Sequence, residues 1–172
     1  MDETIFDDFF VFEYPRLVAA LTLVTGDGDV ARDAVDEACA RAWERVRRNQ
    51  PIDALGAWVR VVALNVARGR FRRRATERRA QQRLGAAASA TTSTASSVDS
   101  ALAIDVARAL ATLPRRQREV VVMHYFLDVA VDDVATQLGV SGGTVKTSLH
   151  RARAALAIRL GDTNDEVLDG IA

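Results

Sequence analysis

One short segment divides the sequence into two parts and limits the size of the domain that each part can form. Residues 85–100 read GAAASATTSTASSVDS, in which 14 of 16 residues are glycine, alanine, serine or threonine. Such a segment buries too little apolar surface to offset the entropy lost on ordering. We therefore predict a flexible linker at 85–100 between two domains at 1–84 and 101–161, with an acidic tail at 162–172. A total of 172 residues excludes large enzyme scaffolds such as an α/β barrel.

Apolar residues in the first domain recur at helical rather than strand spacing. Three helices are predicted: one before the turn at 25–29, one after it, and one from about Leu55 past Arg79. Pro15 is expected to split or kink the first helix. The apolar stripe of the second helix contains Val35, Ala38, Cys39, Ala42, Trp43 and Val46. The stripe of the third contains Trp58, Val61, Val62 and Asn65, with Trp58 expected mainly in the core.

The second domain carries the pattern of a helix-turn-helix. After one helix that ends near Leu113, Pro114 favours a second helix at 115–126. A short helix at 131–138 precedes a tight turn, in which Ser141 is placed to cap a last helix from Gly143 to about Leu160. Short helix, glycine-containing turn and longer helix form the helix-turn-helix signature. The whole chain is thus predicted to be all-α, with two helical domains.

The last helix separates apolar from polar residues. Its predicted inward stripe is Val145, Leu149, Ala152 and Leu156. The residues left outward are Thr144, Lys146, Thr147, His150, Arg151 and Arg153. Short hydroxyls near the amino end and longer cations further along suit the major groove of DNA, where they reach base edges and phosphates. The alternative interpretation is an ordinary solvated helix face.

Charge is balanced overall but segregated along the chain. The sequence has 23 basic and 23 acidic residues, yet residues 1–45 hold 11 acidic and 4 basic ones, whereas residues 60–83 hold 9 arginines and one acid. On the second helix, Asp33, Glu37, Arg41 and Glu44 share one charged stripe. Such segregation indicates an anion-binding surface kept apart from another partner's surface, although for the stripe itself the residues alone favour an ordinary solubilising role.

Other function classes find little support. Asp33 and Glu37 resemble a carboxylate pair, but no nearby histidine, phosphate loop or nucleophile motif accompanies them, so we expect no catalysis and no cofactor. Cys39, His124 and His150 are isolated, so no metal site is expected. A single cysteine allows no internal disulfide, and no run of about 18 apolar residues or signal-peptide pattern occurs. We expect a cytoplasmic protein without membrane insertion.

Four motifs in order resemble a bacterial sigma factor of the small, extracytoplasmic-function type. LVTGD at 23–27 is similar to the end of that family's first conserved helix, and DAVDEACARAW at 33–43 to its core-polymerase-binding helix. AWVRVVALNVAR at 57–68 resembles the helix that melts the promoter and reads its minus-ten element. LPRRQREV at 113–120, followed by GTVKTSLHRAR at 143–153, resembles the domain that reads the minus-thirty-five element.

The resemblance implies a region 2 helical bundle, a region 4 helix-turn-helix, and a dissociable promoter-specificity subunit that is not itself an enzyme. Core RNA polymerase, through its β′ clamp helices and β flap, and promoter DNA are the implied partners, and an inhibitory anti-sigma protein is plausible. The implied polymerase contacts are Asp33, Asp36, Glu37, Arg41 and Trp43. The residues that the resemblance assigns to the minus-ten strand are Asn65, Arg68, Arg72 and Arg73, beside a loop at 49–55. The residues that the resemblance assigns to the minus-thirty-five duplex are Thr144, Lys146, Thr147, His150 and Arg151.

Two other functions remain compatible with the same residues. A stand-alone transcriptional regulator would bind DNA through its helix-turn-helix without polymerase, while its first domain senses a signal or dimerises. A helical adaptor would use its basic face only for protein partners. Nucleic-acid binding with a strong salt dependence would exclude this function. The acidic tail at 162–172 could screen the basic helices or contact a partner, but a solubilising end is favoured.

Overall fold

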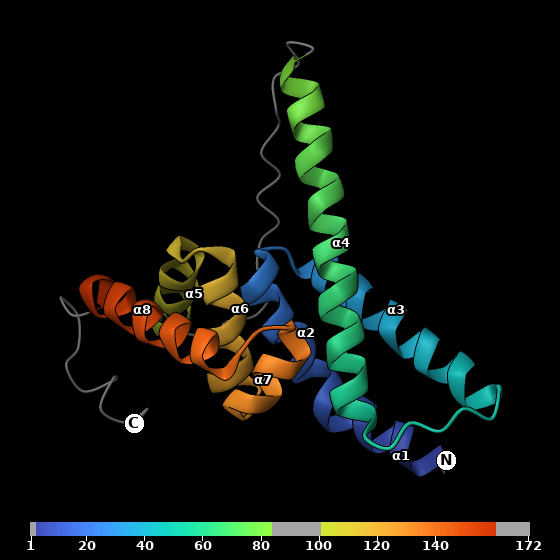
Figure 1. Cartoon of the computed structure of the whole chain (residues 1–172). Helices are drawn as coiled ribbons and strands as arrows, with labels where there is room; N and C mark the ends of the chain where they lie inside the picture. The colour runs from blue at the N-terminus through green and yellow to red at the C-terminus, as the bar shows by residue number, and fades with distance from the viewer. Residues whose placement is uncertain (1–2, 84–100, 161–172) are drawn as a thin grey trace. The chain divides into compact units, whose positions relative to one another are not determined.

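The computed structural model describes residues 3–83 and 101–160, and every regular element within them is helical. This confirms the predicted all-α class. The chain divides into two compact units, with the boundary between residues 95 and 96. Figure 1 shows the helices of both units. The predicted linker at 85–100 and the predicted tail at 162–172 lie outside the described residues.

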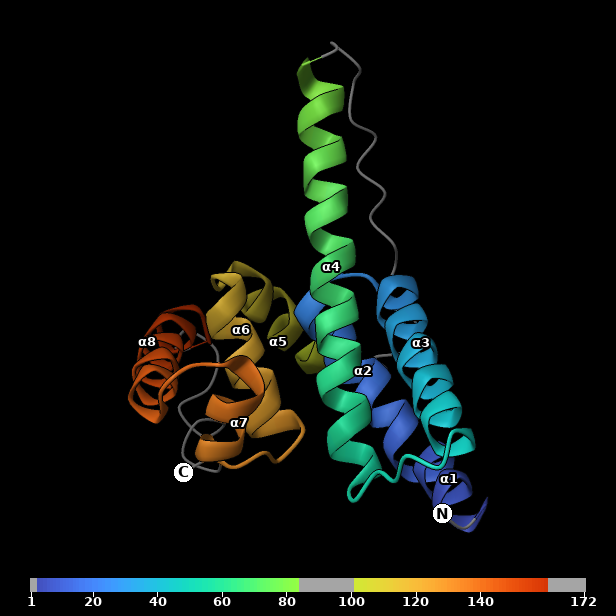
Figure 2. The same ribbon diagram turned by 45° about the vertical axis from the view of Figure 1, so that its right-hand side comes forward.

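Within residues 3–83, unit 1 contains four α-helices and one π-helical segment. They are α1 (Glu3–Asp8), the π-helix η1 (Phe9–Glu13), α2 (Tyr14–Thr25), α3 (Gly28–Arg47) and α4 (Leu55–Arg83). Helix α3 packs against both α2 and α4. Figures 1 and 2 agree that the carboxy-terminal half of α4 projects beyond α2 and α3. The arginine-rich part of α4 is thus presented away from the packed part of the unit.

The turn between α2 and α3 forms for local reasons. Gly26 ends α2 in the left-handed region with φ of +73°, a conformation that glycine adopts without steric cost. Asp27 then caps α3, because its Oδ1 accepts hydrogen bonds from the backbone N–H groups of Asp29 and Val30 at 3.1 and 3.0 Å. The predicted turn at 25–29 is therefore confirmed.

The interruption expected near Pro15 takes the form of a π-helical turn. Pro15 has no backbone N–H to donate within the helix, and the backbone N–H of Tyr14 bonds to the carbonyl of Phe9, five residues back. The wider turn keeps Phe9 buried and leaves its three successors exposed. Phe10, Val11 and Phe12 have relative accessibilities of 46%, 65% and 71%.

The buried face of α4 differs from the predicted stripe. Trp58, Val61 and Val62 are partly buried and Asn65 is exposed, so Trp58 packs at the edge of the core rather than among its fully buried residues. The residues that face the core are Leu55, Val59, Ala63, Leu64 and Ala67. Small side chains let two helices approach closely, and α3 supplies buried alanines of its own at 31, 34, 38 and 42. Close packing against α3 therefore selects the alanine face rather than the bulkier one.

Unit 2 is a compact cluster built around its last helix. It contains α5 (Ala101–Thr112), α6 (Arg115–Val121), the π-helix η2 (Val122–Phe126), α7 (Val131–Leu138) and α8 (Gly142–Leu160). Helix α8 packs against α5, α6 and α7. The predicted helices at 115–126 and 131–138 are confirmed, except that Val122–Phe126 is π-helical and Pro114 is the N-cap residue of α6.

A buried ionic cluster holds α6 and α7 together. The Glu119 carboxylate is 2% exposed and accepts hydrogen bonds from Arg115 Nε and Arg116 Nη1, each at 3.2 Å. Arg116 Nη2 also donates to the carbonyl of Leu138 at 2.6 Å, at the end of α7. A buried carboxylate is tolerated only when it is paired and hydrogen-bonded. The helix-turn-helix therefore rests on an internal ion pair that sequence patterns did not reveal.

Candidate functional site

The turn before α8 fixes the direction of that helix. Gly139 ends α7 in the left-handed region with φ of +64°. Ser141 Oγ accepts a hydrogen bond from the backbone N–H of Thr144 at 3.2 Å, which satisfies an otherwise unpaired donor at the start of α8. Asp132 of α7 lies close to Gly142, where a Cβ would stand 3.3 Å from the Asp132 Oδ1. The cap predicted at Ser141 is confirmed.

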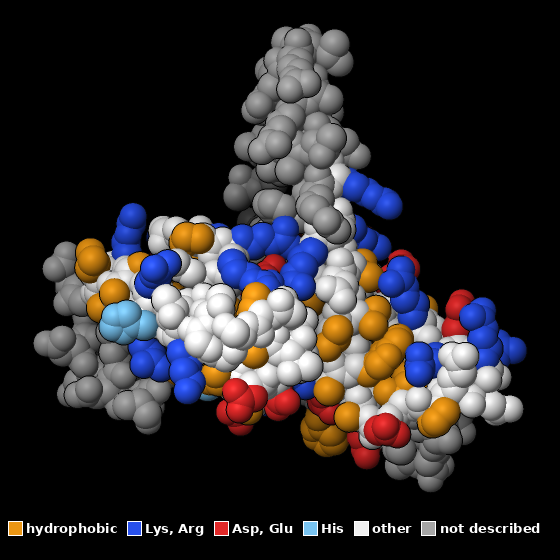
Figure 3. Space-filling view, in the orientation of Figure 1, with side chains coloured by type: hydrophobic (Ala, Val, Ile, Leu, Met, Phe, Trp, Pro, Cys, Tyr) orange, Lys and Arg blue, Asp and Glu red, His pale blue; other side chains and the backbone are white. Residues whose placement is uncertain are grey.

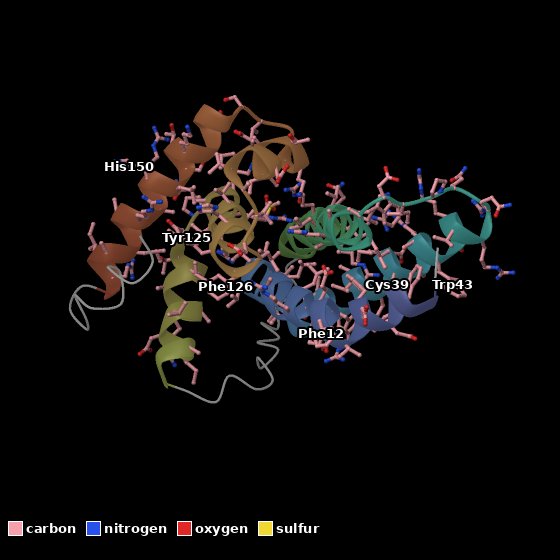
Figure 4. The ribbon with its side chains drawn as sticks, turned by 90° about the horizontal axis from the view of Figure 1, so that it is seen from below. Phe12, Cys39, Trp43, Tyr125, Phe126 and His150 are labelled. Atoms are coloured by element: carbon pink, nitrogen blue, oxygen red, sulfur yellow. The ribbon has the colours of Figure 1, made fainter. Side chains whose placement is uncertain are left out.

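One face of α8 is buried and the opposite one is free for a ligand. Val145, Leu149 and Ala152 are 0–4% exposed. The residues expected outward are exposed in the structure: Thr144, Lys146, Thr147, His150, Arg151 and Arg153. Figure 3 shows basic side chains and a histidine over α8, and Figure 4 shows His150 projecting away from the unit. This face offers hydroxyls and cations without any large apolar side chain until Ile158.

The acidic stripe of α3 is exposed but already engaged within the unit. Arg70 of α4 contacts Asp33 Oδ2 through Nη1 at 2.6 Å and Glu37 Oε2 through Nη2 at 3.8 Å. Arg41 Nη2 contacts Glu37 Oε1 at 2.8 Å. The side chains of Asp33 and Glu37 remain 63% and 41% exposed, so both keep carboxylate surface toward solvent. Arg70 thus ties the acidic helix to the arginine-rich helix.

A second carboxylate on α3 is held by a tyrosine from α2. Tyr14 Oη donates to Asp36 Oδ1 at 2.6 Å. Desolvation and the Asp36 carboxylate raise the pKa of Tyr14 to about 12, so the hydroxyl keeps its proton at neutral pH. Burial, with a contribution from Asp36, likewise raises the pKa of the Cys39 thiol to about 11, so Cys39 stays a neutral thiol packed below the surface.

Trp43 lies at the surface rather than in the core stripe predicted for it. It is 47% exposed, and its ring meets the buried Phe6 edge-on with 5.3 Å between centroids. Figure 4 shows Trp43 on α3 near the amino-terminal helix. A half-exposed tryptophan beside an acidic stripe offers apolar contact area to a partner.

On α4, the residues expected to face the minus-ten strand are separated from the core. Asn65 is exposed and its Oδ1 accepts from Arg68 Nη1 at 3.3 Å, while Arg73 is exposed. The side chain of Arg72 is not among those described. The preceding loop is anchored near its start, where the N–H of Gln50 bonds to the carbonyl of Arg45 at 3.1 Å, and in its middle, where Ile52 is buried.

A close contact also fixes the start of α4. A Cβ on Gly56 would meet the Glu13 carboxylate, so a larger residue at this position would require the exposed Glu13 side chain to move. Sequence reasoning did not single out either residue. Within residues 3–83 and 101–160, no group of three or more His, Cys, Asp or Glu side chains could hold a metal ion. No helix in the same ranges is long and apolar enough to cross a membrane.

Comparison with known proteins places both units. Residues 11–77 match the family described as Sigma-70 region 2, and residues 103–156 match Sigma-70, region 4. The ECF RNA polymerase sigma factor SigL of Mycobacterium tuberculosis is 33% identical over 139 residues, covering 80% of this chain and 78% of that protein. This chain is an extracytoplasmic-function sigma factor of the sigma-70 family.

Further relatives agree with this assignment. The RNA polymerase sigma-E factor of Streptomyces coelicolor is 30% identical to this sigma factor over 154 residues, covering 88% of the chain and 83% of the relative. The fold is similar to that of the sigma factor RpoE from Bartonella quintana, solved in complex with the anti-sigma factor NepR, with a TM-score of 0.75 and 23% identity. That match covers 95% of this chain and 100% of the other. The stand-alone regulator is not favoured, because the first unit matches region 2 rather than a sensing domain.

Proposed function

We propose that this sigma factor docks on core RNA polymerase through α3 and directs it to promoters through α4 and α8. The observation that carries this proposal is the separation of two exposed surfaces of opposite character. Asp33, Asp36 and Glu37 present carboxylates on α3, whereas α8 presents Lys146 and Arg151 beside short hydroxyls. Complementary charge steers such encounters and fixes their register.

The polymerase side is proposed to be the β′ clamp helices, contacted by the acidic stripe and Trp43. Partner cations can approach the exposed edges of Asp33 and Glu37 while Arg70 and Arg41 hold the carboxylates in place. A residue that is already oriented loses less conformational entropy on binding. Trp43 would add an apolar anchor of the kind that dominates many interfaces. The β flap is proposed as a second contact, made by unit 2.

The DNA side is divided between the units. Asn65 and Arg68, with Arg72, Arg73 and the loop at 49–55, are proposed to hold the single-stranded minus-ten element, where unstacked bases are open to hydrogen bonds and stacking. Thr144, Lys146, Thr147, His150 and Arg151 are proposed to enter the major groove at minus thirty-five. Because polymerase fixes the distance between the two elements, the second contact forms at high effective concentration.

The chain itself is proposed to carry out no reaction and to need no cofactor; it supplies recognition while polymerase makes the RNA. A cytoplasmic site of action follows from these partners. An inhibitory protein of the anti-sigma class is also proposed, since the Bartonella quintana RpoE structure contains one.

Capture of core polymerase by the tagged full-length chain at low salt tests the proposal. Asp33→Arg should reduce capture by tenfold or more, since like charges placed opposite one another cost several kcal/mol and each 1.4 kcal/mol or so is a factor of about ten in affinity. Asp105→Arg is the matched control, because Asp105 is also an exposed aspartate beside an arginine, Arg108 at 3.8 Å, but lies on α5. Equal capture by the wild type and both variants would refute docking through α3.

A further inference from the structure

The exposed face of α8 consists of two stripes with different surroundings. Lys146, His150 and Arg153 each directly follow a buried residue, so they lie about 100° around the helix from the core. We call these three the flanking stripe. Thr147 and Arg151 each lie two residues after a buried one, about 200° from the core, and form the leading stripe with Thr144.

A tyrosine outside α8 supports the flanking stripe at one end. Arg153 Nε donates to the Tyr125 hydroxyl at 2.6 Å, and the guanidinium carbon lies 5.7 Å from the centre of the Tyr125 ring. Tyr125 belongs to η2 and is half-buried. Figure 4 places Tyr125 on the side of α8 that faces the rest of unit 2. The guanidinium is therefore held by both an oxygen and an aromatic face.

This arrangement leaves the other end of the guanidinium available. Tyr125 engages Nε, and within the described residues no acceptor engages the two terminal Nη nitrogens. The residue as a whole is exposed. A guanidinium whose Nη groups face solvent in a fixed orientation matches the two-pronged recognition of a phosphate.

We propose that Arg153, oriented by Tyr125, is a phosphate anchor that sets how α8 lies in the minus-thirty-five major groove. This inference rests on the proposed function and assigns Arg153 and Tyr125 roles outside the base-reading set. A helix whose leading stripe enters the groove turns its sides toward the phosphate backbones that border the groove. Arg153, at the carboxy-terminal end of the flanking stripe, then faces one backbone, and within the described residues neither Lys146 nor His150 is held by a second element in this way.

Two different roles follow for the two residues. Arg153 contributes charge and hydrogen bonds to DNA directly. Tyr125 touches no DNA and is a positioning residue that acts only through Arg153. Since phosphate contacts fix register without reading sequence, loss of Arg153 should weaken binding to all DNA sequences to a similar extent.

The salt dependence of binding distinguishes a phosphate contact from a packing role. The full-length chain is assembled with core polymerase, and its affinity is measured on a duplex that the wild-type assembly selects from fragmented genomic DNA. Arg153→Ala should weaken binding by about tenfold and lower the slope of log affinity against log salt by about 1. Arg159→Ala removes an arginine from the last turn of the same helix and should leave the slope unchanged. An Arg153→Ala slope equal to that of the wild type would overturn the proposal.

A double-mutant cycle tests whether Tyr125 acts through Arg153. Tyr125→Phe keeps the ring but removes the acceptor, so it should weaken binding by about two- to fivefold with no change in slope. Arg153→Lys keeps the charge and should also retain the slope, which guards against a folding defect in Arg153→Ala. In the Arg153→Ala background, Tyr125→Phe should have no further effect. The same loss in both backgrounds would show that Tyr125 acts independently.

Failure of the inference and failure of the proposed function give different results. If the wild-type assembly selected no DNA fragment, the proposed function would fail and this inference with it. If it selected fragments and Arg153→Ala bound them as tightly as the wild type at every salt concentration, only the phosphate anchor would fail.

Discussion

Helices α3 and α8 both present charged residues to solvent, but the carboxylates of α3 are paired within unit 1, whereas most cations on the outer face of α8 have no partner among the described residues. Asp33 and Glu37 are paired with Arg70 or Arg41, and Asp36 accepts from Tyr14. On α8, Lys146, His150 and Arg151 make no hydrogen bond or ion pair within the described residues. In the proposed function, the acidic residues of α3 therefore act both within unit 1 and on a partner, whereas Lys146, His150 and Arg151 of α8 act only on a partner.

This difference teaches that exposure alone does not identify a binding residue. An exposed and internally paired carboxylate affects stability and docking when it is changed. An exposed cation without an internal partner affects binding only. Substitutions on the two helices should consequently separate these two outcomes.

The largest effect on stability is expected at the buried carboxylate of Glu119. Glu119→Ala would leave Arg115 and Arg116 without their carboxylate and should destabilise unit 2 by about 3 kcal/mol. Hydrogen exchange should accelerate in α5 to α8 and stay unchanged in α3. As a control, Asp105→Ala breaks an exposed pair and should cost less than about 0.5 kcal/mol. Faster exchange in α3 as well would show that the units do not unfold independently.

Arg151→Ala tests a charged residue that is proposed to bind DNA and to have no role in the stability of unit 2. It should weaken promoter binding by the polymerase assembly about 5- to 150-fold, or about 1–3 kcal/mol, if Arg151 contacts a base edge. Stability should change by less than about 0.5 kcal/mol, because Arg151 is exposed and has no partner among the described residues of unit 2. Titration of core polymerase should give the wild-type affinity. If polymerase binding fell as much as promoter binding, the division between α3 and α8 would be wrong.

Asp33→Asn tests a carboxylate that is paired within unit 1 and is also proposed to contact polymerase. It should lower the affinity for core polymerase by about fivefold or less and destabilise unit 1 by about 0.5 kcal/mol, since its ion pair with Arg70 is exposed. Urea denaturation and polymerase titration measure the two effects. Arg70→Ala should reproduce the loss of stability while leaving the Asp33 carboxylate in place. Unchanged stability in both variants would mean that this ion pair does not hold α3 to α4.

The smallest effect is expected at alkaline pH. Tyr14 keeps its proton in the folded chain up to a pKa of about 12 but loses it near 10.0 when unfolded, so its stabilising contribution is present below pH 10.0 and is lost as pH rises toward 12. The raised pKa of Cys39 acts in the same direction between about 9 and 11. Tyr14→Phe should flatten the fall in the free energy of unfolding between pH 10 and 12. An unaltered pH profile would contradict the Tyr14–Asp36 contact.

Local patterns were sufficient for much of this fold. The bounds of α7, the Ser141 cap and three of the four predicted inward residues of α8 follow from spacing and turn chemistry, whereas the fourth, Leu156, is only partly buried. The exposed residues of α8 follow from the same periodicity. The family could also be assigned from four ordered motifs.

Local sequence patterns did not predict the contacts between residues that are far apart in the chain. Asp33 meets Arg70 and Arg153 meets Tyr125 across 37 and 28 residues, and periodicity does not report which helices lie side by side. The sequence pattern predicted that the face of α4 with the larger side chains packs in the core, whereas the face that contains the alanines is buried. Alanines give a weak hydrophobic signal, even though they allow the closest packing. The π-helical turns were missed because a helical pattern assumes a constant 100° per residue.

Sequencing of the RNA made by core polymerase from fragmented genomic DNA, with and without this sigma factor, tests the central claim most directly. We expect a new set of start points that depends on the chain and shares two upstream sequence elements at a fixed spacing. Arg151→Ala should weaken selection of the upstream element alone. Identical start points with and without the chain, under low-salt conditions that favour assembly, would contradict the account.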